Sequence, residues 1–172
     1  MKTLLLALSV CLAFSAAPLA ADAAATKAEV LANLADANKK IISLAEAMPA
    51  DSYGWRPMEG VRSVSETYMH IAGANYYFGG QIKAPKPEGV DPSSLEKTMT
   101  KKADCIAALK ASITYVTKAL ENVDDLNAPM KVFGRDSTQF GLALIVVAHA
   151  HEHLGQSIAY ARSNKVVPPW SK

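Results

Sequence analysis

The stretch VVAHAHEHLGQSIAY, residues 146–160, places three of the four histidines of the chain within five residues. On a helix, residues four apart share one face, with Cβ atoms about 5–6 Å apart. His149 and His153 meet that condition, whereas His151 lies two residues from each and points to roughly the opposite side. The stretch therefore predicts a helix that turns one pair of imidazoles toward the interior of the protein.

A histidine pair of this kind can offer two nitrogens to one transition metal. A third ligand is needed, and His70 is the only other histidine in the sequence. Three histidine ligands leave coordination positions for water or substrate, which is typical of a catalytic rather than a closed structural site. Spacing alone leaves two simpler interpretations open. The pair can be a solvated feature of a helix surface, and His70 can be a hydrogen-bonded core histidine.

The rest of the chain shows helical spacing of apolar residues in four segments and the strict alternation of a strand in none. The pattern predicts helices over residues 26–48, 63–78, 95–120 and 137–163. Pro49 stops the first helix. Ser63 and Glu66 have the spacing of a capping box at the start of the second helix, and Ser93 and Glu96 repeat it at the third.

The connections and the last helix indicate how these helices pack. The Pro-rich stretch KAPKPEGVDPSS, residues 83–94, is a long crossover between the second and third helices. The segment FGLALIVVA, residues 140–148, is apolar all round and predicts that the last helix is the most buried. Four helices with one longer connection favour an all-α four-helix bundle.

The N-terminus has the pattern of a secretory signal peptide over residues 1–23. Lys2 is followed by an apolar run over 4–14 and by Ala21-Asp22-Ala23, an A-x-A cleavage pattern. This predicts a single mature domain over residues 24–172 and a secreted or periplasmic location. No later stretch reaches about 18 uninterrupted apolar residues, so no stable membrane span is expected after processing.

Charge and motifs narrow the functional classes. The net charge is +2 at pH 7 and the longest runs of basic residues are the pairs Lys39-Lys40 and Lys101-Lys102, so no nucleic-acid partner is expected. Cys105 is the single cysteine left after processing, which excludes an intramolecular disulfide. Gly155 stands where an HExxH motif starting at His151 would need its second histidine. A small-molecule partner is expected, and an apolar bundle face leaves a homodimer open.

Two stretches, YGWRPMEGVRSVSETYMHIAGAN (53–75) and HAHEHLGQSIAYAR (149–162), together with the order of four helices, resemble the DinB/YfiT-like superfamily of metal-binding bundles. In that family, a WRP-type loop precedes the second helix, whose histidine is the first ligand. A His-x-x-x-His followed by a Gly-Gln pair on the last helix supplies the other two. The resemblance implies an all-α four-helix bundle of the DinB/YfiT-like type, with the longer crossover between helices 2 and 3. It also implies that His70, His149 and His153 are the metal ligands.

The resemblance also implies a range of activities. Characterised relatives include cytosolic transferases that use low-molecular-weight thiols, and such thiols are scarce outside the cytoplasm. The leading hypothesis is an exported protein that binds a divalent transition metal (Zn, Ni or Fe) and acts as a metal-dependent hydrolase or thiol transferase-like enzyme on an unknown small molecule. The alternatives are a non-catalytic envelope metal-binding protein and a purely structural bundle. Trp55 and Arg56 are expected to cap the bundle end, Tyr77 or Gln156 to orient a substrate, and Glu152 to be a surface charge.

Overall fold

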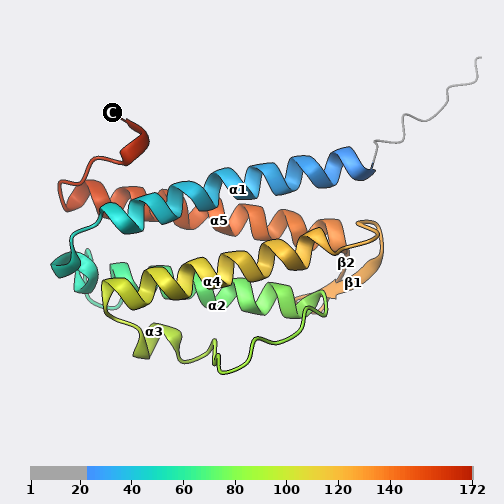
Figure 1. Ribbon diagram of the computed structural model, residues 1–172, viewed down its shortest axis with the longest axis horizontal. Coiled ribbons are helices and arrows are strands. Elements are labelled where there is room, and N and C mark those ends of the chain that lie inside the picture. Colours follow the sequence, from blue (N-terminus) through green and yellow to red (C-terminus); the bar gives the residue numbers. More distant parts are fainter. Residues whose placement is uncertain (1–22, 172) are drawn as a thin grey trace, which may run out of the picture.

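Four long helices lie side by side in the computed structural model, which describes residues 23–171 (Figure 1). The long helices are α1 (Ala23–Ala47), α2 (Val64–Gln81), α4 (Lys102–Glu121) and α5 (Gln139–Ser163). The shorter elements are η1 (Ala50–Gly54), α3 (Leu95–Thr98), β1 (Pro129–Val132), β2 (Arg135–Thr138) and η2 (Pro169–Ser171). The predicted signal segment lies outside the described residues except for Ala23.

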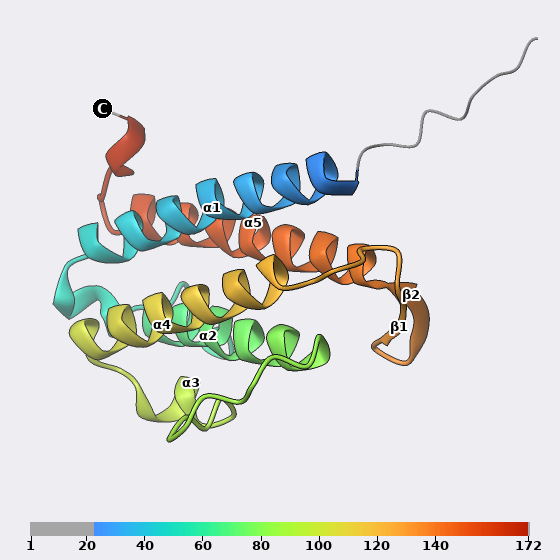
Figure 2. The ribbon, with the colours of Figure 1, turned by 45° about the vertical axis from the view of Figure 1, so that its right-hand side comes forward.

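Each long helix packs against two others. α1 contacts α5 and α4, and α2 contacts α4 and α5. α1 and α5 run in one direction and α2 and α4 in the other, as both ribbon views show (Figures 1 and 2). Two parallel neighbours need a long connection, which is why the chain crosses over between α2 and α4. The predicted all-α bundle with its crossover is therefore confirmed. Within residues 23–171, no helix has the length and apolar character needed to span a bilayer.

The hydrophobic core is built from side chains of all four long helices. Its large and fully buried members include Leu34, Ile41, Met69, Leu109, Val116 and Leu142. The prediction that the last helix is the most buried is wrong. Eleven of the 18 residues of α2 are buried, against nine of the 25 residues of α5. Leu144 of α5 is 48% exposed, because the all-round apolar segment turns one side to the surface.

The capping box at the start of α2 is present as predicted. Ser63 Oγ accepts a hydrogen bond from the Glu66 N–H at 3.2 Å, and the Glu66 carboxylate accepts from the Ser63 N–H at 2.7 Å. Arg56 donates to Glu66 at 3.1 Å and to the carbonyl of Val61 at 3.0 Å. The expected structural role of Arg56 is thus observed, and the loop before α2 is tied to the helix that carries His70.

Replacing Ser63 by alanine should lower the free energy of unfolding by about 1 kcal/mol, the usual cost of losing an N-cap hydroxyl. Urea denaturation followed by circular dichroism measures this change. Ser94→Ala is the control, because Ser94 occupies the N-cap of α3 and its hydroxyl donates to the Asp91 carbonyl without capping the helix. Equal losses of stability in the two variants would show that the capping box contributes nothing specific.

The prediction of one continuous third helix is wrong, since the helix is interrupted between α3 and α4. Met99 and Lys101 are extended, and the predicted cap at Ser93 is absent. Ser93 bonds Asp91 instead, through both its N–H and its hydroxyl. The break is needed because α3 lies on α2 at the outside of the bundle, whereas α4 packs between α1 and α2. Lys102 fixes the start of α4 by donating to two carbonyls at the end of α1.

A short hairpin, which the sequence pattern does not reveal, precedes α5. β1 and β2 pair antiparallel, with Pro129 opposite Thr138 and Val132 opposite Arg135. Each strand has four residues and only Val132 is buried, so alternation is too short to register as a strand pattern. α5 therefore begins at Gln139 rather than near Ser137.

Candidate metal centre

Three histidines meet where α2 and α5 pack against each other. His70 comes from α2, and His149 and His153 come from α5, one turn apart. One nitrogen from each ring can be chosen so that all three lie within 4.8 Å of one another. His70 Nε2 and His149 Nε2 are 3.2 Å apart. His151 is exposed on the opposite side of the helix. The geometry of α5 thus keeps His151 apart from His149 and His153, and His70 of α2 is the third member of the cluster.

His70 is oriented by a carboxylate from the crossover. Its Nδ1 lies 3.1 Å from Oε1 of Glu96, which is on α3, and Glu96 in turn accepts from Arg62 Nε at 2.8 Å. A carboxylate can only accept, so Nδ1 of His70 carries the proton and Nε2 is left free to face the other imidazoles. Such an outer partner fixes the tautomer and the ring orientation of a metal-ligating histidine.

His153 is oriented by a second chain of hydrogen bonds. Its Nδ1 donates to Gln156 Oε1 at 2.7 Å, and Gln156 Nε2 donates to the Tyr160 hydroxyl at 3.1 Å. The Tyr160 hydroxyl donates to the carbonyl of Arg62 at 3.0 Å. Trp55 packs edge-on against Tyr160, with ring centroids 5.3 Å apart. The hydrogen-bond chains from His70 and from His153 therefore both end at Arg62, one at its guanidinium group and one at its carbonyl.

His149 is held by packing. Phe78 meets its ring nearly at a right angle, with centroids 5.5 Å apart. Burial, with smaller contributions from His153 and His70, lowers the pKa of His149 to about 4. Burial also lowers the pKa of His70, helped by the charge of Arg62 and opposed by Glu96. Both rings are neutral at pH 7, the form in which imidazole binds a metal.

The arrangement of the three rings fits a divalent metal. His70 Nε2 is an acceptor, because its Nδ1 holds the proton, so His149 Nε2–H donates to it in the metal-free protein. The separation of 3.2 Å between these nitrogens is close to the distance of about 3.3 Å expected between two ligands of tetrahedral zinc at about 2.0–2.1 Å. A metal would take the place of the proton that His149 and His70 share, with the His153 nitrogen completing the set of three within 4.8 Å.

One side of the histidine cluster opens into a cavity of about 550 Å³. His70 and His149 form part of its wall, and His153 is buried behind them with 7% of its surface exposed. Phe78 lies beside the cluster without closing it, and Trp55 lies on Tyr160, outside the lining of this cavity. The site is therefore reachable by a small molecule.

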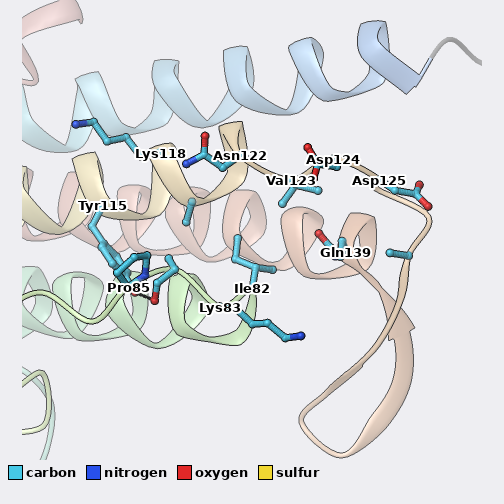
Figure 3. A pocket seen from close by; sticks show the side chains of 13 residues that line it. Ile82, Lys83, Pro85, Tyr115, Lys118, Asn122, Val123, Asp124, Asp125 and Gln139 are labelled. Atoms are coloured by element: carbon cyan, nitrogen blue, oxygen red, sulfur yellow. Dashed lines mark hydrogen bonds between the residues drawn. The ribbon is translucent and has the colours of Figure 1, made fainter.

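A larger cavity, of about 640 Å³, lies elsewhere, between the ends of α2 and α4 and the start of α5 (Figure 3). Its titratable side chains are dispersed along the wall, and none of the three histidines lines it. Asp125 is bonded to the N–H of Asn127. Among residues 23–171, only the histidine cluster brings together three side chains suited to one metal ion. Cavity size therefore does not identify the chemical site, whereas the donor atoms do.

Protonation of His149 should destabilise the metal-free protein in mild acid. Its pKa is 6.5 when unfolded and about 4 when folded. Between these values the unfolded chain binds more protons, so the free energy of unfolding falls as the pH is lowered from 6.5 towards 4. The loss should be on the order of 2 kcal/mol. Urea titrations of the chelator-treated protein at pH 7.5 and 5 measure it.

The matched variant for this pH experiment is His149→Gln, which cannot titrate. The difference between wild type and variant removes the contribution of the carboxylates, which titrate in both proteins. His149→Gln should lose less stability on acidification. An identical pH dependence in the two proteins would contradict the burial of a neutral His149.

The structure also assigns roles to residues that sequence reasoning missed or left open. Glu96 was expected to cap a helix and instead bonds His70. Gln156 is occupied by His153 and Tyr160, so it holds a histidine rather than a substrate. Tyr77 does line the cavity, and Glu152 lies exposed. The sequence gives no local signal for the link from Glu96 to His70, because the two residues meet only through the crossover.

Comparison with known proteins agrees with this architecture. Residues 33–157 match the model of the DinB superfamily. A DinB-like protein from Bacillus cereus superposes with a TM-score of 0.70 at 15% identity, covering 81% of this chain and 93% of that one. A DinB-like protein from Bacillus subtilis superposes with a TM-score of 0.65 at 24% identity, with the same coverage. No curated protein shows a significant match.

Proposed function

The chain belongs to the DinB superfamily, and from that premise we propose that it binds one divalent transition metal through His70, His149 and His153. The observation that carries the proposal is the convergence of three imidazole nitrogens within 4.8 Å. Two of the three rings are oriented from outside by hydrogen bonds that leave Nε2 turned toward the cluster. A core histidine without a metal role would not need two further histidines as neighbours.

We further propose that the site is catalytic. Three protein ligands leave positions for a small molecule, and the cavity of about 550 Å³ reaches His70 and His149. A divalent metal there would supply Lewis acidity and lower the pKa of a water or thiol. The chain's own contribution is to keep the imidazoles neutral and oriented and to admit the substrate from one side. Zn, Ni or Fe suit imidazole ligands.

The reaction class that fits this site is hydrolysis or group transfer. A screen of ester and thiol substrates tests it, with protein that has been stripped by chelator and then reloaded with Zn, Ni or Fe. Turnover should disappear on stripping and return on reloading. A metal-loaded protein that is silent across the screen would favour the alternative, a non-catalytic metal-binding protein of the envelope.

We infer export from the N-terminal pattern over residues 1–23, which has the charged start, apolar run and small residues of a signal peptide. Mass spectrometry of the protein recovered from the envelope of a Gram-negative host tests this inference. A mature N-terminus at Ala24 is expected. Protein that stays in the cytoplasm with residues 1–23 attached would contradict it.

A further inference from the structure

Two exposed aromatic side chains stack on each other at the mouth of the histidine cavity. Tyr77 is near the end of α2 and is 45% exposed, and Phe133 is at the tip of the hairpin and is 62% exposed. Their ring centroids are 5.9 Å apart and their planes differ by 8°. Both line the cavity that reaches His70 and His149. An apolar surface this open does not arise from the packing of the core.

Phe133 holds this position in an unfavourable backbone conformation. It has φ = 49° and Gly134 has φ = 78°, in the two-residue loop between Val132 and Arg135. A loop with positive φ at both positions strongly prefers Asn-Gly or Asp-Gly. A bulky residue there is an outlier, and such strain concentrates at functional sites. The turn itself would therefore form more easily with asparagine, so the aromatic ring has to be explained by what it contacts.

The remaining wall of the cavity has few polar groups that are free to bind a ligand. Phe78, Ala74 and Pro92 contribute apolar surface. Glu96 is engaged by Arg62 and His70, and Ser93 is engaged by Asp91. The polar end of a ligand is thus directed to the imidazoles, and its apolar body to the stacked pair.

Charge at the inner end of the cavity favours an anionic group. Three neutral imidazoles would leave the charge of a divalent metal uncompensated, and the nearest carboxylate, Glu96, already shares its charge with Arg62 at 2.8 Å. Opposite charges at close range stabilise each other, most strongly where the surroundings are partly buried. A negatively charged ligand atom at this end would offset the remaining positive charge of the metal.

We propose that the cavity binds small molecules with a flat aromatic body and a short anionic head group that ligates the metal. The head group binds beside His70 and His149, and the ring lies against Tyr77 and Phe133. This specificity rests on the proposed metal centre and names the substrate class that the centre selects.

The test compares two probes with the same head group on the Co²⁺-loaded protein. Benzohydroxamate carries an aromatic ring and acetohydroxamate a methyl group, and the visible absorption of Co²⁺ reports the binding of either. Aromatic contact should make benzohydroxamate bind about tenfold more tightly or better. Equal dissociation constants for the two probes, with Co²⁺ bound, would overturn the proposed specificity and leave the metal centre standing.

Two variants locate the preference. Phe133→Asn introduces the residue that the turn favours, so the protein should be as stable as wild type or more stable, with unchanged Co²⁺ content and unchanged acetohydroxamate binding. The preference for benzohydroxamate over acetohydroxamate should fall to about threefold or less in Phe133→Asn and also in Tyr77→Ala. Val167→Asn alters an exposed apolar residue that does not line the cavity and should keep the preference.

The outcomes separate the two proposals. A preference that survives in both Phe133→Asn and Tyr77→Ala would overturn the role of the stacked pair. A wild-type protein that fails to bind Co²⁺ would overturn the proposed metal centre, and the ligand specificity would fall with it.

Discussion

Replacing His153 by alanine is expected to lower the affinity for Zn²⁺ by more than about 100-fold, because the loss of an outer partner alone typically costs about 10–100-fold. His153 is the most buried of the three histidines, and its Nδ1–H is bonded to Gln156, so its Nε2 is positioned before any metal arrives. The two remaining imidazoles bind a metal only weakly. His70→Ala and His149→Ala should behave alike. Isothermal titration calorimetry with the chelator-treated protein measures each dissociation constant.

His151→Ala is the matched control for the loss of a histidine. His151 lies on the same helix, two residues from both proposed ligands, and its side chain is exposed on the other face. This variant should bind Zn²⁺ as wild type does. Circular dichroism should show that the helix content of each of the four single-histidine variants equals that of the wild type. Wild-type affinity in His153→Ala, or an equal loss in His151→Ala, would contradict the assignment of the ligands.

Replacing Glu96 by alanine should weaken metal binding by about 10–100-fold although Glu96 is not itself a proposed ligand. The carboxylate accepts from His70 Nδ1 at 3.1 Å and thereby keeps Nε2 directed at His149. Burial of Glu96 opposes its ionisation, but the bonds from Arg62 and His70 outweigh that effect and hold its pKa below the usual range. Without the carboxylate, the Arg62 charge would stand unopposed beside His70.

Two further variants distinguish orientation from charge. Glu96→Gln keeps an oxygen that can accept from His70 and should lose less affinity than Glu96→Ala. Glu152→Ala removes an exposed carboxylate that adjoins His153 in the sequence, and its affinity should not change. The same titrations as for the histidine variants apply, and thermal melting of each metal-free protein reports its stability. Affinity in Glu96→Ala equal to that of Glu152→Ala would show that Glu96 does not orient His70.

Local patterns were sufficient to predict much of the fold. The apolar spacing identified α1, α2 and α5 to within a few residues, because each helix turns one continuous face to the core. The Ser63–Glu66 spacing identified the start of α2, since both bonds of a capping box lie within four residues. In these elements, local preference and tertiary packing agree.

The prediction failed where tertiary packing overrides the local pattern. Residues 95–120 have continuous helical spacing, yet the chain must leave α2 before it can enter the bundle as α4, so it breaks at Met99. The hairpin around Phe133 is too short for its alternation to be recognised, and its turn lacks the usual asparagine. Of the residues in these two regions, Glu96 of α3 and Phe133 of the hairpin line the histidine cavity.

The three histidines of the candidate site were predictable from the sequence, whereas the residues that orient them were not. His149 and His153 share a helix face by spacing, and His70 followed from the family resemblance. Glu96 is 26 residues from His70 in sequence, and only the path of the crossover brings it to His70 and to Arg62, which lies just before α2. The stacked pair of Tyr77 and Phe133 likewise joins a helix end to a hairpin tip.

The metal content of the purified protein tests the central claim most directly. The mature chain, residues 24–172, should be purified without a histidine tag and without added metal, in parallel with a variant in which His70, His149 and His153 are all alanine. Elemental analysis should find close to one Zn, Ni or Fe ion per chain in the wild type and only traces in the triple variant, whose helix content should be unchanged. Equal trace amounts in both proteins, persisting after incubation of the wild type with each metal and desalting, would contradict a three-histidine metal centre.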